Sequence, residues 1–184
     1  MMENINLTGG KSCCQPAGNV ISKALDLSNS TNKLISFPSD SSDAAVSITL
    51  PSSLVNRYQP GQRVHFFNFK NDKLFPRSKN NKGNFINSEI VSATIKGKPV
   101  RNLSDHIIIE FNLSDTKYSG NSSCAFWDFE ADGGYGAWSK DGCEFEMIDK
   151  GRARCSCKHL THFGILVVSI SNFIIVQNTI SPTR

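Results

Sequence analysis

A histidine and a threonine stand two residues apart near the C-terminus, in His159-Leu160-Thr161. A neutral imidazole can act as a general base, and a threonine hydroxyl becomes a nucleophile when a base removes its proton. In an extended strand the two side chains would lie roughly 7 Å apart, whereas proton transfer needs about 3 Å. The pair can therefore do chemistry only if the backbone bends at Leu160-Thr161.

His162 is a second candidate base beside Thr161. Because successive side chains of a straight strand point to opposite faces, His162 would face away from Thr161. We therefore expect His159 to be the base. His65 and His106 fall within runs that read as strands, and we interpret them as surface histidines or core histidines with satisfied hydrogen bonds.

Four cysteines precede this histidine and threonine in the sequence: Cys124, Cys143, Cys155 and Cys157. Cys155 and Cys157 have the same parity as His159 and Thr161, so an extended strand would place all four on one face. Cα atoms two residues apart on a strand are roughly 6.5 to 7 Å from each other, near the upper limit for a disulfide. Cys155 and Cys157 should therefore pair with more distant cysteines, which leaves two of the three connectivities.

This region resembles the GPS motif, the self-cleavage site of the adhesion G-protein-coupled receptors. The resemblance is carried by Cys124-Ala125-Phe126-Trp127, Trp138, Gly142-Cys143 and the run from Cys155-Ser156-Cys157 through Lys158-His159-Leu160-Thr161-His162-Phe163-Gly164. It implies disulfides between Cys124 and Cys155 and between Cys143 and Cys157. It also implies that the chain cuts itself between Leu160 and Thr161, in a tight turn between its last two strands.

The mechanism that the resemblance implies is an N-to-O acyl shift. His159 would take the proton of the Thr161 hydroxyl, the oxygen would attack the Leu160 carbonyl carbon, and water would hydrolyse the resulting ester. The reaction would occur in cis, without turnover of external substrates and without a cofactor. Where many family members have Asn, this chain has Lys158, whose positive charge would help to keep His159 neutral.

The C-terminal product is expected to stay bound, because its apolar residues would form a buried strand. In the family this segment acts as a tethered agonist on a seven-helix receptor domain. Its partners would thus be the N-terminal product and that receptor domain; the sequence names no extracellular ligand. The matching residues in this chain are Thr161, His162, Phe163, Gly164, Ile165, Leu166 and Val167. The run from Thr161 to Leu166 looks most like the group that includes the developmental and epididymal receptors, known as group VIII or G.

Other interpretations of the same residues compete with cleavage. The Cys-x-Cys-x-His spacing from Cys155 to His159 could bind zinc, but the resemblance argues against any metal site. Trp127 and Trp138 are expected to be structural residues that pack in the core or on the disulfides. A structural or ligand-binding module with the same fold, which does not cleave, is the alternative function.

Cysteine content and glycosylation signals favour an oxidising, extracellular setting. Five Asn-x-Ser/Thr sequons begin at Asn6, Asn29, Asn102, Asn112 and Asn121. The adjacent Cys13 and Cys14 are expected to pair elsewhere or to be free.

The net charge of +4 is spread along the chain, which does not favour nucleic-acid binding. We expect the protein to lie at the extracellular face of the plasma membrane, as part of a receptor. No signal peptide is recognisable at Met1, and the apolar run from Gly164 to Val176 is too short to span a bilayer, so we expect the chain to be a fragment of that receptor.

Short runs of β-branched and aromatic residues between turn signals predict an all-β, antiparallel sandwich. The expected strands are Val46–Leu50, Val64–Phe69, Ile90–Ile95, His106–Phe111, Cys124–Phe129, Glu144–Ile148, Arg154–His159 and Phe163–Val168. The most continuous apolar run, His106–Phe111, is expected to be covered on both faces. Residues 44 to 168, with the GPS motif at 124 to 164, resemble subdomain B of the GAIN domain. Residues 1 to 43 read as a loose lead-in with a short helix at Val20–Leu27, and 169 to 184 as a tail.

Overall fold

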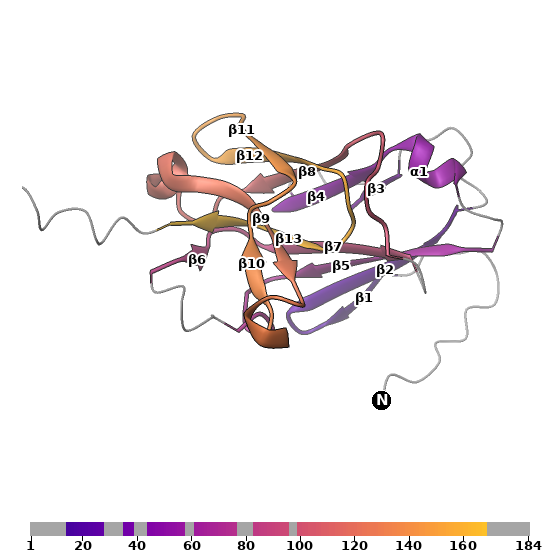
Figure 1. Cartoon of the computed structure of the whole chain (residues 1–184), viewed down its shortest axis with the longest axis horizontal. Helices are drawn as coiled ribbons and strands as arrows, with labels where there is room; N and C mark the ends of the chain where they lie inside the picture. Colours follow the sequence, from indigo (N-terminus) through magenta and orange to yellow (C-terminus); the bar gives the residue numbers. More distant parts are fainter. Residues whose placement is uncertain are drawn as a thin grey trace, which may run out of the picture.

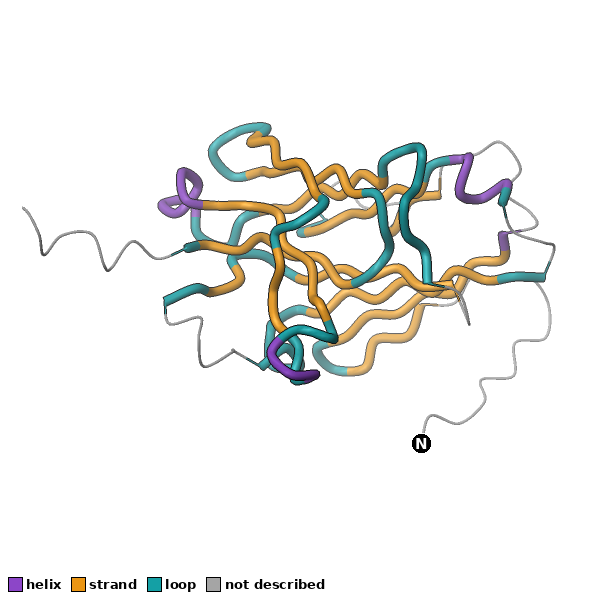
Figure 2. Tube along the Cα trace, in the orientation of Figure 1, coloured by secondary structure: helices purple, strands orange, loops and turns teal. Residues whose placement is uncertain are grey.

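The chain folds into two antiparallel β-sheets that pack face to face, as Figure 1 shows. A computed structural model gives the structure of the protein and describes residues 14–27, 35–38, 44–57, 61–76, 83–95 and 99–168. Strands make up most of the described chain, and short helical turns occur only at connections between them (Figure 2). The all-β sandwich predicted from the sequence is confirmed.

The larger sheet has the order β1-β2-β5-β7-β13-β9-β10, and β6 also pairs with β13. The interior strand β13 therefore has partners on both of its edges. In that spatial order the strands are β1 (Cys14–Ala17), β2 (Val20–Asp26), β5 (Arg63–Phe69), β7 (Ile90–Ile95), β13 (His162–Val167), β9 (Ser122–Asp128) and β10 (Ala137–Ser139), with β6 at Phe85–Ile86.

The smaller sheet has the order β11-β12-β8-β4-β3. Its strands are β11 (Cys143–Met147), β12 (Arg152–Cys157), β8 (Ile107–Asn112), β4 (Val46–Leu50) and β3 (Ile35–Phe37). Within the described ranges, the helical segments with printed bounds are α1 (Ser52–Asn56) and the 3-10 helices η2 (Thr116–Asn121) and η3 (Asp132–Gly134), and they lie outside the sheets. Among the described residues, no helix has the length and apolar character needed to cross a bilayer.

The main core lies between the two sheets and is built from every second side chain of their strands. In β8, Ile107, Ile109 and Phe111 are buried, whereas Ile108 and Glu110 are only half-buried. The prediction that this strand is covered on both faces is therefore wrong. Ile108 points away from the core, but its side chain is still half-buried, and an isoleucine is therefore compatible with this outward-facing position.

A second, smaller apolar cluster lies on the outer side of the larger sheet, around Phe75, Ile90 and Trp127. Val91 and Ala93, which alternate with Ile90 along β7, belong to the main core instead. The larger sheet is therefore covered on both faces near β13, because the segment that follows β5 places Phe75 over its outer face. Phe69, Ile86 and Trp138 pack against the same cluster.

The predicted helix at Val20–Leu27 is wrong, because Val20–Asp26 forms β2. All seven residues of β2 pair with Arg63–Phe69 of β5, so the ladder to a distant strand overrides the weak local pattern. β1 and β3 also precede residue 44 and pair within the two sheets. The proposed division into lead-in, sandwich and tail stays a prediction, and the tail at 169 to 184 lies outside the described residues.

Candidate functional site

Four residues, 158 to 161, carry the chain from one sheet to the other. β12 ends at Cys157 in the smaller sheet, and β13 begins at His162 in the larger one. The backbone N–H of Leu103 donates to the carbonyl of Lys158 over 2.9 Å, and the N–H of Leu160 donates to the carbonyl of Val100 over 3.0 Å. The Leu160-Thr161 link thus lies in a bent crossing, held by the segment before β8, and not in a regular ladder.

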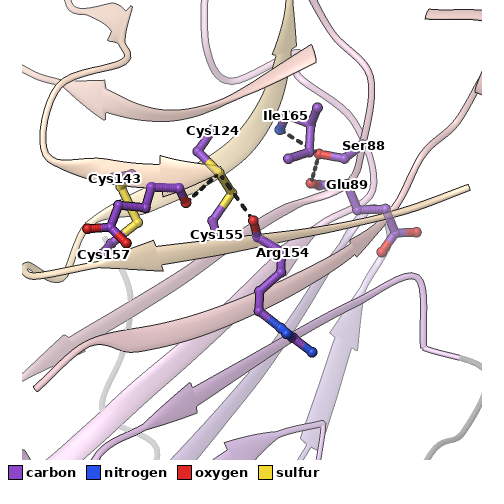
Figure 3. Close-up of a disulfide and its surroundings, with 9 residues drawn as sticks. Ser88, Glu89, Cys124, Cys143, Arg154, Cys155, Cys157 and Ile165 are labelled. Atoms are coloured by element: carbon purple, nitrogen blue, oxygen red, sulfur yellow. Dashed lines mark hydrogen bonds between the residues drawn. A yellow bond between two sulfur atoms is a disulfide. The ribbon is translucent and has the colours of Figure 1, made fainter. Parts of the chain in front are cut away.

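Two disulfides hold the strand that leads into this crossing (Figure 3). Cys124 of β9 is bonded to Cys155 of β12, with Cα atoms 5.8 Å apart, so this disulfide joins the two sheets. Cys143 of β11 is bonded to Cys157 directly opposite it in β12, with Cα atoms 4.4 Å apart. This is the pairing that the resemblance implied. Because all four sulfurs are in disulfides, none is available to zinc as a thiolate.

The hydroxyl of Thr161 donates a hydrogen bond to the backbone carbonyl oxygen of Trp127, over 3.2 Å. The Trp127 side chain is buried in the outer cluster, where its ring lies 5.4 Å from that of Phe75 and 5.5 Å from that of Trp138. Gly136, with φ of +85°, lies directly against the indole, so that a Cβ atom there would overlap it. Tight packing therefore fixes the strand position whose carbonyl holds the Thr161 hydroxyl.

The imidazole of His159 is partly buried between aromatic rings. Its centroid lies 4.6 Å from that of Phe126 and 5.4 Å from that of Phe163, and its Nε2 atom is buried without a hydrogen-bond partner. Burial lowers the pKa of His159 below 6.5, and the positive charge of Arg101 lowers it further. The ring is consequently neutral near pH 7. The sequence suggested Lys158 for this electrostatic role, but the contributing charge is that of Arg101.

Base and nucleophile are not joined through Nε2 in this structure. The single proton of the Thr161 hydroxyl points to Trp127, while Nε2 of His159 has no partner. The bend brings the two residues onto one short crossing, but proton transfer requires the Thr161 hydroxyl to turn away from the Trp127 carbonyl.

His162, the competing base, is packed in an aromatic environment on the outer side of the larger sheet. Its ring lies 5.4 Å from those of Phe75 and Phe129 and 5.7 Å from that of Phe69. Burial lowers its pKa to about 4. Its Nδ1 atom has no hydrogen-bond partner, and neither has the buried hydroxyl of Ser92, which is paired with His162 across β7 and β13. The rings around it, those of Phe69, Phe75 and Phe129, are apolar.

The strand that follows the crossing is deeply embedded in the fold. Every residue of β13 from Phe163 to Val167 is buried. β9 pairs with it along one edge, whereas β7 and β6 share the other edge. The segment expected to act as a tethered agonist is therefore enclosed within the sheet.

Three of the predicted sequons lie at exposed positions: Asn102, Asn112 and Asn121. The other two, at Asn6 and Asn29, lie outside the described residues, as does Cys13. Cys14 begins β1. Glycosylation at any of these sites stays a prediction.

Sequence reasoning missed the groups that surround the pair. The carbonyl of Trp127 is a backbone atom and has no signature in the sequence. Phe75 and Arg101 reach the site from connections that are distant in sequence, so only the fold reveals them. Gly136 had a signal that could have been used, because it belongs to the glycine-rich run Gly133-Gly134-Tyr135-Gly136 beside the two tryptophans.

Residues 17–171 match the sequence profile of the family described as GPS: GAIN subdomain B. The chain is 33% identical over 145 residues to adhesion G-protein coupled receptor G6 of Danio rerio, covering 76% of this chain and 12% of that relative. It is 36% identical over 131 residues to adhesion G-protein coupled receptor G4 of Mus musculus, covering 67% of this chain and 4% of that relative. The chain thus spans only a small part of these proteins.

One solved structure, the full extracellular region of zebrafish Gpr126/Adgrg6, has a similar fold. It superposes with a TM-score of 0.72 and 24% sequence identity, covering 84% of this chain and 23% of that one. At this level of identity, the superposition establishes the fold alone.

Proposed function

The chain belongs to the GPS/GAIN subdomain B family, and we propose that it is a self-cleaving extracellular module of an adhesion G-protein-coupled receptor, which cuts between Leu160 and Thr161. The observation that carries this proposal is the position of that peptide bond. It lies in a bent crossing between the two sheets, directly after a strand fixed by two disulfides. The nucleophile and the attacked carbonyl are neighbours on one constrained segment, which is a proximity effect.

In the proposed reaction, the Thr161 hydroxyl turns from the Trp127 carbonyl and gives its proton to His159. The Thr161 oxygen then bonds to the carbonyl carbon of Leu160. The tetrahedral intermediate collapses as the Leu160–Thr161 C–N bond breaks, and the proton passes to the departing nitrogen. This leaves an ester and a free amine, and water hydrolyses the ester to give fragments 1–160 and 161–184. The lowered pKa of His159 supports this role, because only the neutral imidazole can accept the proton.

After cleavage, we expect the C-terminal product to remain in place. Burying each large apolar side chain contributes about 1.5 to 3 kcal/mol, so four of them contribute roughly 6 to 12 kcal/mol before entropy is subtracted. The four are Phe163, Ile165, Leu166 and Val167. Ladder hydrogen bonds on both edges of β13 add to this. The product would be a tethered agonist, with the N-terminal product and a seven-helix receptor domain as its partners.

An extracellular location fits the two disulfides, which persist in oxidising compartments, and the three exposed sequons. The relatives are adhesion receptors, and the similar solved structure is an extracellular region. We therefore place the module at the outer face of the plasma membrane, as part of a longer receptor.

A module that folds in this way without cutting itself is the second candidate. One observation favours it: the Thr161 hydroxyl is bonded to Trp127, and Nε2 of His159 has no partner. If the hydroxyl never leaves this arrangement, the site would be a structural joint between the sheets.

Denaturing gel electrophoresis of the chain, secreted from eukaryotic cells with a tag at each end, distinguishes the two candidates. We expect two bands from the wild type and one full-length band from Thr161→Ala and from His159→Gln. A single full-length band from the wild type would reject self-cleavage.

The control variants make the same substitutions, threonine to alanine and histidine to glutamine, at positions away from the proposed cleavage site. Thr94→Ala removes an exposed threonine hydroxyl from β7, and His106→Gln removes a histidine near the start of β8. Both should cleave as the wild type does. His162→Gln tests the competing base, and loss of cleavage in this variant but not in His159→Gln would reassign the role.

A further inference from the structure

The edge of β13 that faces β7 and β6 is interrupted in the middle. His162 and Phe163 pair with Ser92 and Val91 of β7, and Leu166 and Val167 pair with Ile86 and Phe85 of β6. Between these two ladders the four residues 87 to 90 stand opposite only the two residues 164 and 165. Such an insertion interrupts the regular backbone hydrogen bonds between the strands. Backbone N–H and C=O groups of β13 at this point therefore need other hydrogen-bond partners.

Asn87 and Ser88 supply those partners to Ile165. The backbone N–H of Asn87 donates to the carbonyl of Ile165 over 2.7 Å, and the N–H of Ile165 donates to the hydroxyl oxygen of Ser88 over 2.9 Å. The Ser88 hydroxyl in turn donates to the carbonyl of Glu89 over 2.7 Å. Figure 3 shows Ser88 between Ile165 and Glu89. The Ser88 hydroxyl thus accepts the hydrogen bond that a backbone carbonyl would accept in a regular ladder, and it donates its own proton to the Glu89 carbonyl.

The short segment Asn87-Ser88-Glu89 is itself held at both ends. The side chain of Asn87 donates to the carbonyl of Asp115 and accepts from its N–H, each over 2.9 Å. The carboxylate of Glu89 accepts from Asn68 of β5 over 2.9 Å and pairs with Lys70 over 2.8 Å. The hydrogen bonds and the ion pair of Asn87 and Glu89 therefore fix the position of Ser88 beside β13.

We propose that Asn87-Ser88 is a retention clamp: it sets how firmly the strand beginning at Thr161 stays in the sheet after cleavage. The proposal rests on the proposed self-cleavage and deepens it. Asn87 and Ser88 are only 2% and 7% exposed, so water cannot readily replace the serine hydroxyl. Without that hydroxyl, the buried N–H of Ile165 would have no partner. Ser88 does not touch the cleaved bond, so its role is in holding the product and not in making it.

Release of the C-terminal fragment tests the clamp. The full chain is immobilised through its N-terminus, allowed to cleave, and washed in mild urea while the C-terminally tagged fragment is measured in the eluate. We expect Ser88→Ala to cleave normally and to release the fragment roughly tenfold faster than the wild type.

Ser36→Ala is the matched control. It removes a serine hydroxyl that shares a 2.9 Å hydrogen bond with Thr49 in the smaller sheet, away from β13. We expect it to release the fragment at the wild-type rate. In the uncut Thr161→Ala background, thermal unfolding of both serine variants separates a general loss of stability from a specific loss of retention.

Equal release rates for Ser88→Ala and the wild type, with normal cleavage, would overturn the clamp and leave the proposed cleavage intact. So would equal acceleration by Ser88→Ala and Ser36→Ala. If the wild type does not cut itself, the proposed function fails. The clamp is then measured in the uncut chain, where unchanged hydrogen exchange of the Ile165 amide in Ser88→Ala would overturn it.

Discussion

The hydroxyl of Thr161 and the carbonyl oxygen of Trp127 are hydrogen-bonded over 3.2 Å. This contact joins the first residue of the proposed C-terminal product to β9, which is 34 residues away in sequence. It makes the orientation of the nucleophile depend on where Trp127 lies. Trp127 is positioned by its buried indole, so packing around that ring should influence chemistry at Thr161.

Substitution of Gly136 should test this dependence. A Cβ atom at Gly136 would overlap the Trp127 indole, so Gly136→Ala must displace the ring and the carbonyl attached to it. Because small misplacements of reacting groups can cost up to about 100-fold in rate, we expect a large loss of cleavage. The fraction of chain that is cut, followed over time after synthesis on denaturing gels, measures this effect.

Gly134→Ala is the control for backbone strain. Gly134 has φ of +91°, close to the +85° of Gly136, but nothing lies within 4 Å of the position of its Cβ. Both alanine variants should lose about 1 kcal/mol or more of stability from the left-handed backbone. Only Gly136→Ala should lose cleavage, and equal loss in the two variants would contradict a role for the indole.

Loss of each disulfide should destabilise the fold to a different degree. The Cys124–Cys155 disulfide closes 31 residues and Cys143–Cys157 closes 14. The chain-entropy relation gives about 3.7 kcal/mol for the longer loop and about 3 kcal/mol for the shorter. We expect Cys124→Ser/Cys155→Ser to be the less stable double variant, also because it loses the link between the sheets. Urea unfolding in the uncut Thr161→Ala background gives both values, and a reversed order would contradict this ranking.

The sequence predicted much of the sandwich because its strand runs alternate or are richly β-branched. Val46–Leu50 and Ile90–Ile95 have the predicted bounds, and the others differ by one or two residues at their ends. β2 was mistaken for a helix because its longer ladder is with β5, more than 35 residues away, and leaves no trace in the local pattern, although its other partner, β1, directly precedes it. Local spacing cannot report a ladder to a distant strand.

The candidate site divides in the same way. His159, Leu160 and Thr161 were found because they are consecutive and because a bend between them could be required on geometric grounds alone. That bend arises from a change of sheet between β12 and β13, which spacing does not show. The Ser88 hydroxyl and the Trp127 carbonyl became visible only with the register, since each replaces or supplements a backbone contact of the last strand.

The ionisation of His159 can be measured without cleavage. In the uncut Thr161→Ala variant, its pKa should lie below 6.5 because the ring is partly buried and Arg101 is near. Arg101→Gln should raise the pKa, since one of the two causes is removed. The Cε1 proton of His159, followed by NMR as a function of pH, reports the midpoint.

Lys158→Gln is the charge-matched control for Arg101→Gln. Lys158 is adjacent to His159 in sequence, but its side chain is exposed. We expect a smaller rise than in Arg101→Gln. A larger rise in Lys158→Gln would return the electrostatic role to the lysine, and no change in either variant would leave burial as the sole cause.

His162 should make the fold sensitive to acid. Its pKa falls from 6.5 to about 4 on folding because the ring is buried among phenylalanines. Between these values the unfolded chain binds the proton more strongly, so the free energy of unfolding decreases as pH falls from 6.5 towards 4 and is unaffected above this window. The full shift corresponds to about 3 kcal/mol, and incomplete burial reduces our expectation to about 2 kcal/mol.

Comparison with His162→Phe isolates this histidine, because every carboxylate titrates in both proteins. Phenylalanine keeps an aromatic ring beside Phe69, Phe75 and Phe129 but cannot be protonated. In urea unfolding of uncut chains at pH 7.5 and 4.5, the protein with His162 should lose about 2 kcal/mol more than the variant. Equal losses of unfolding free energy in the two proteins would mean that the protonated His162 ring is hydrated or hydrogen-bonded in the folded state. Since His162 is the second residue of the proposed product, the loss with His162 would also predict easier release of that strand in acidic compartments.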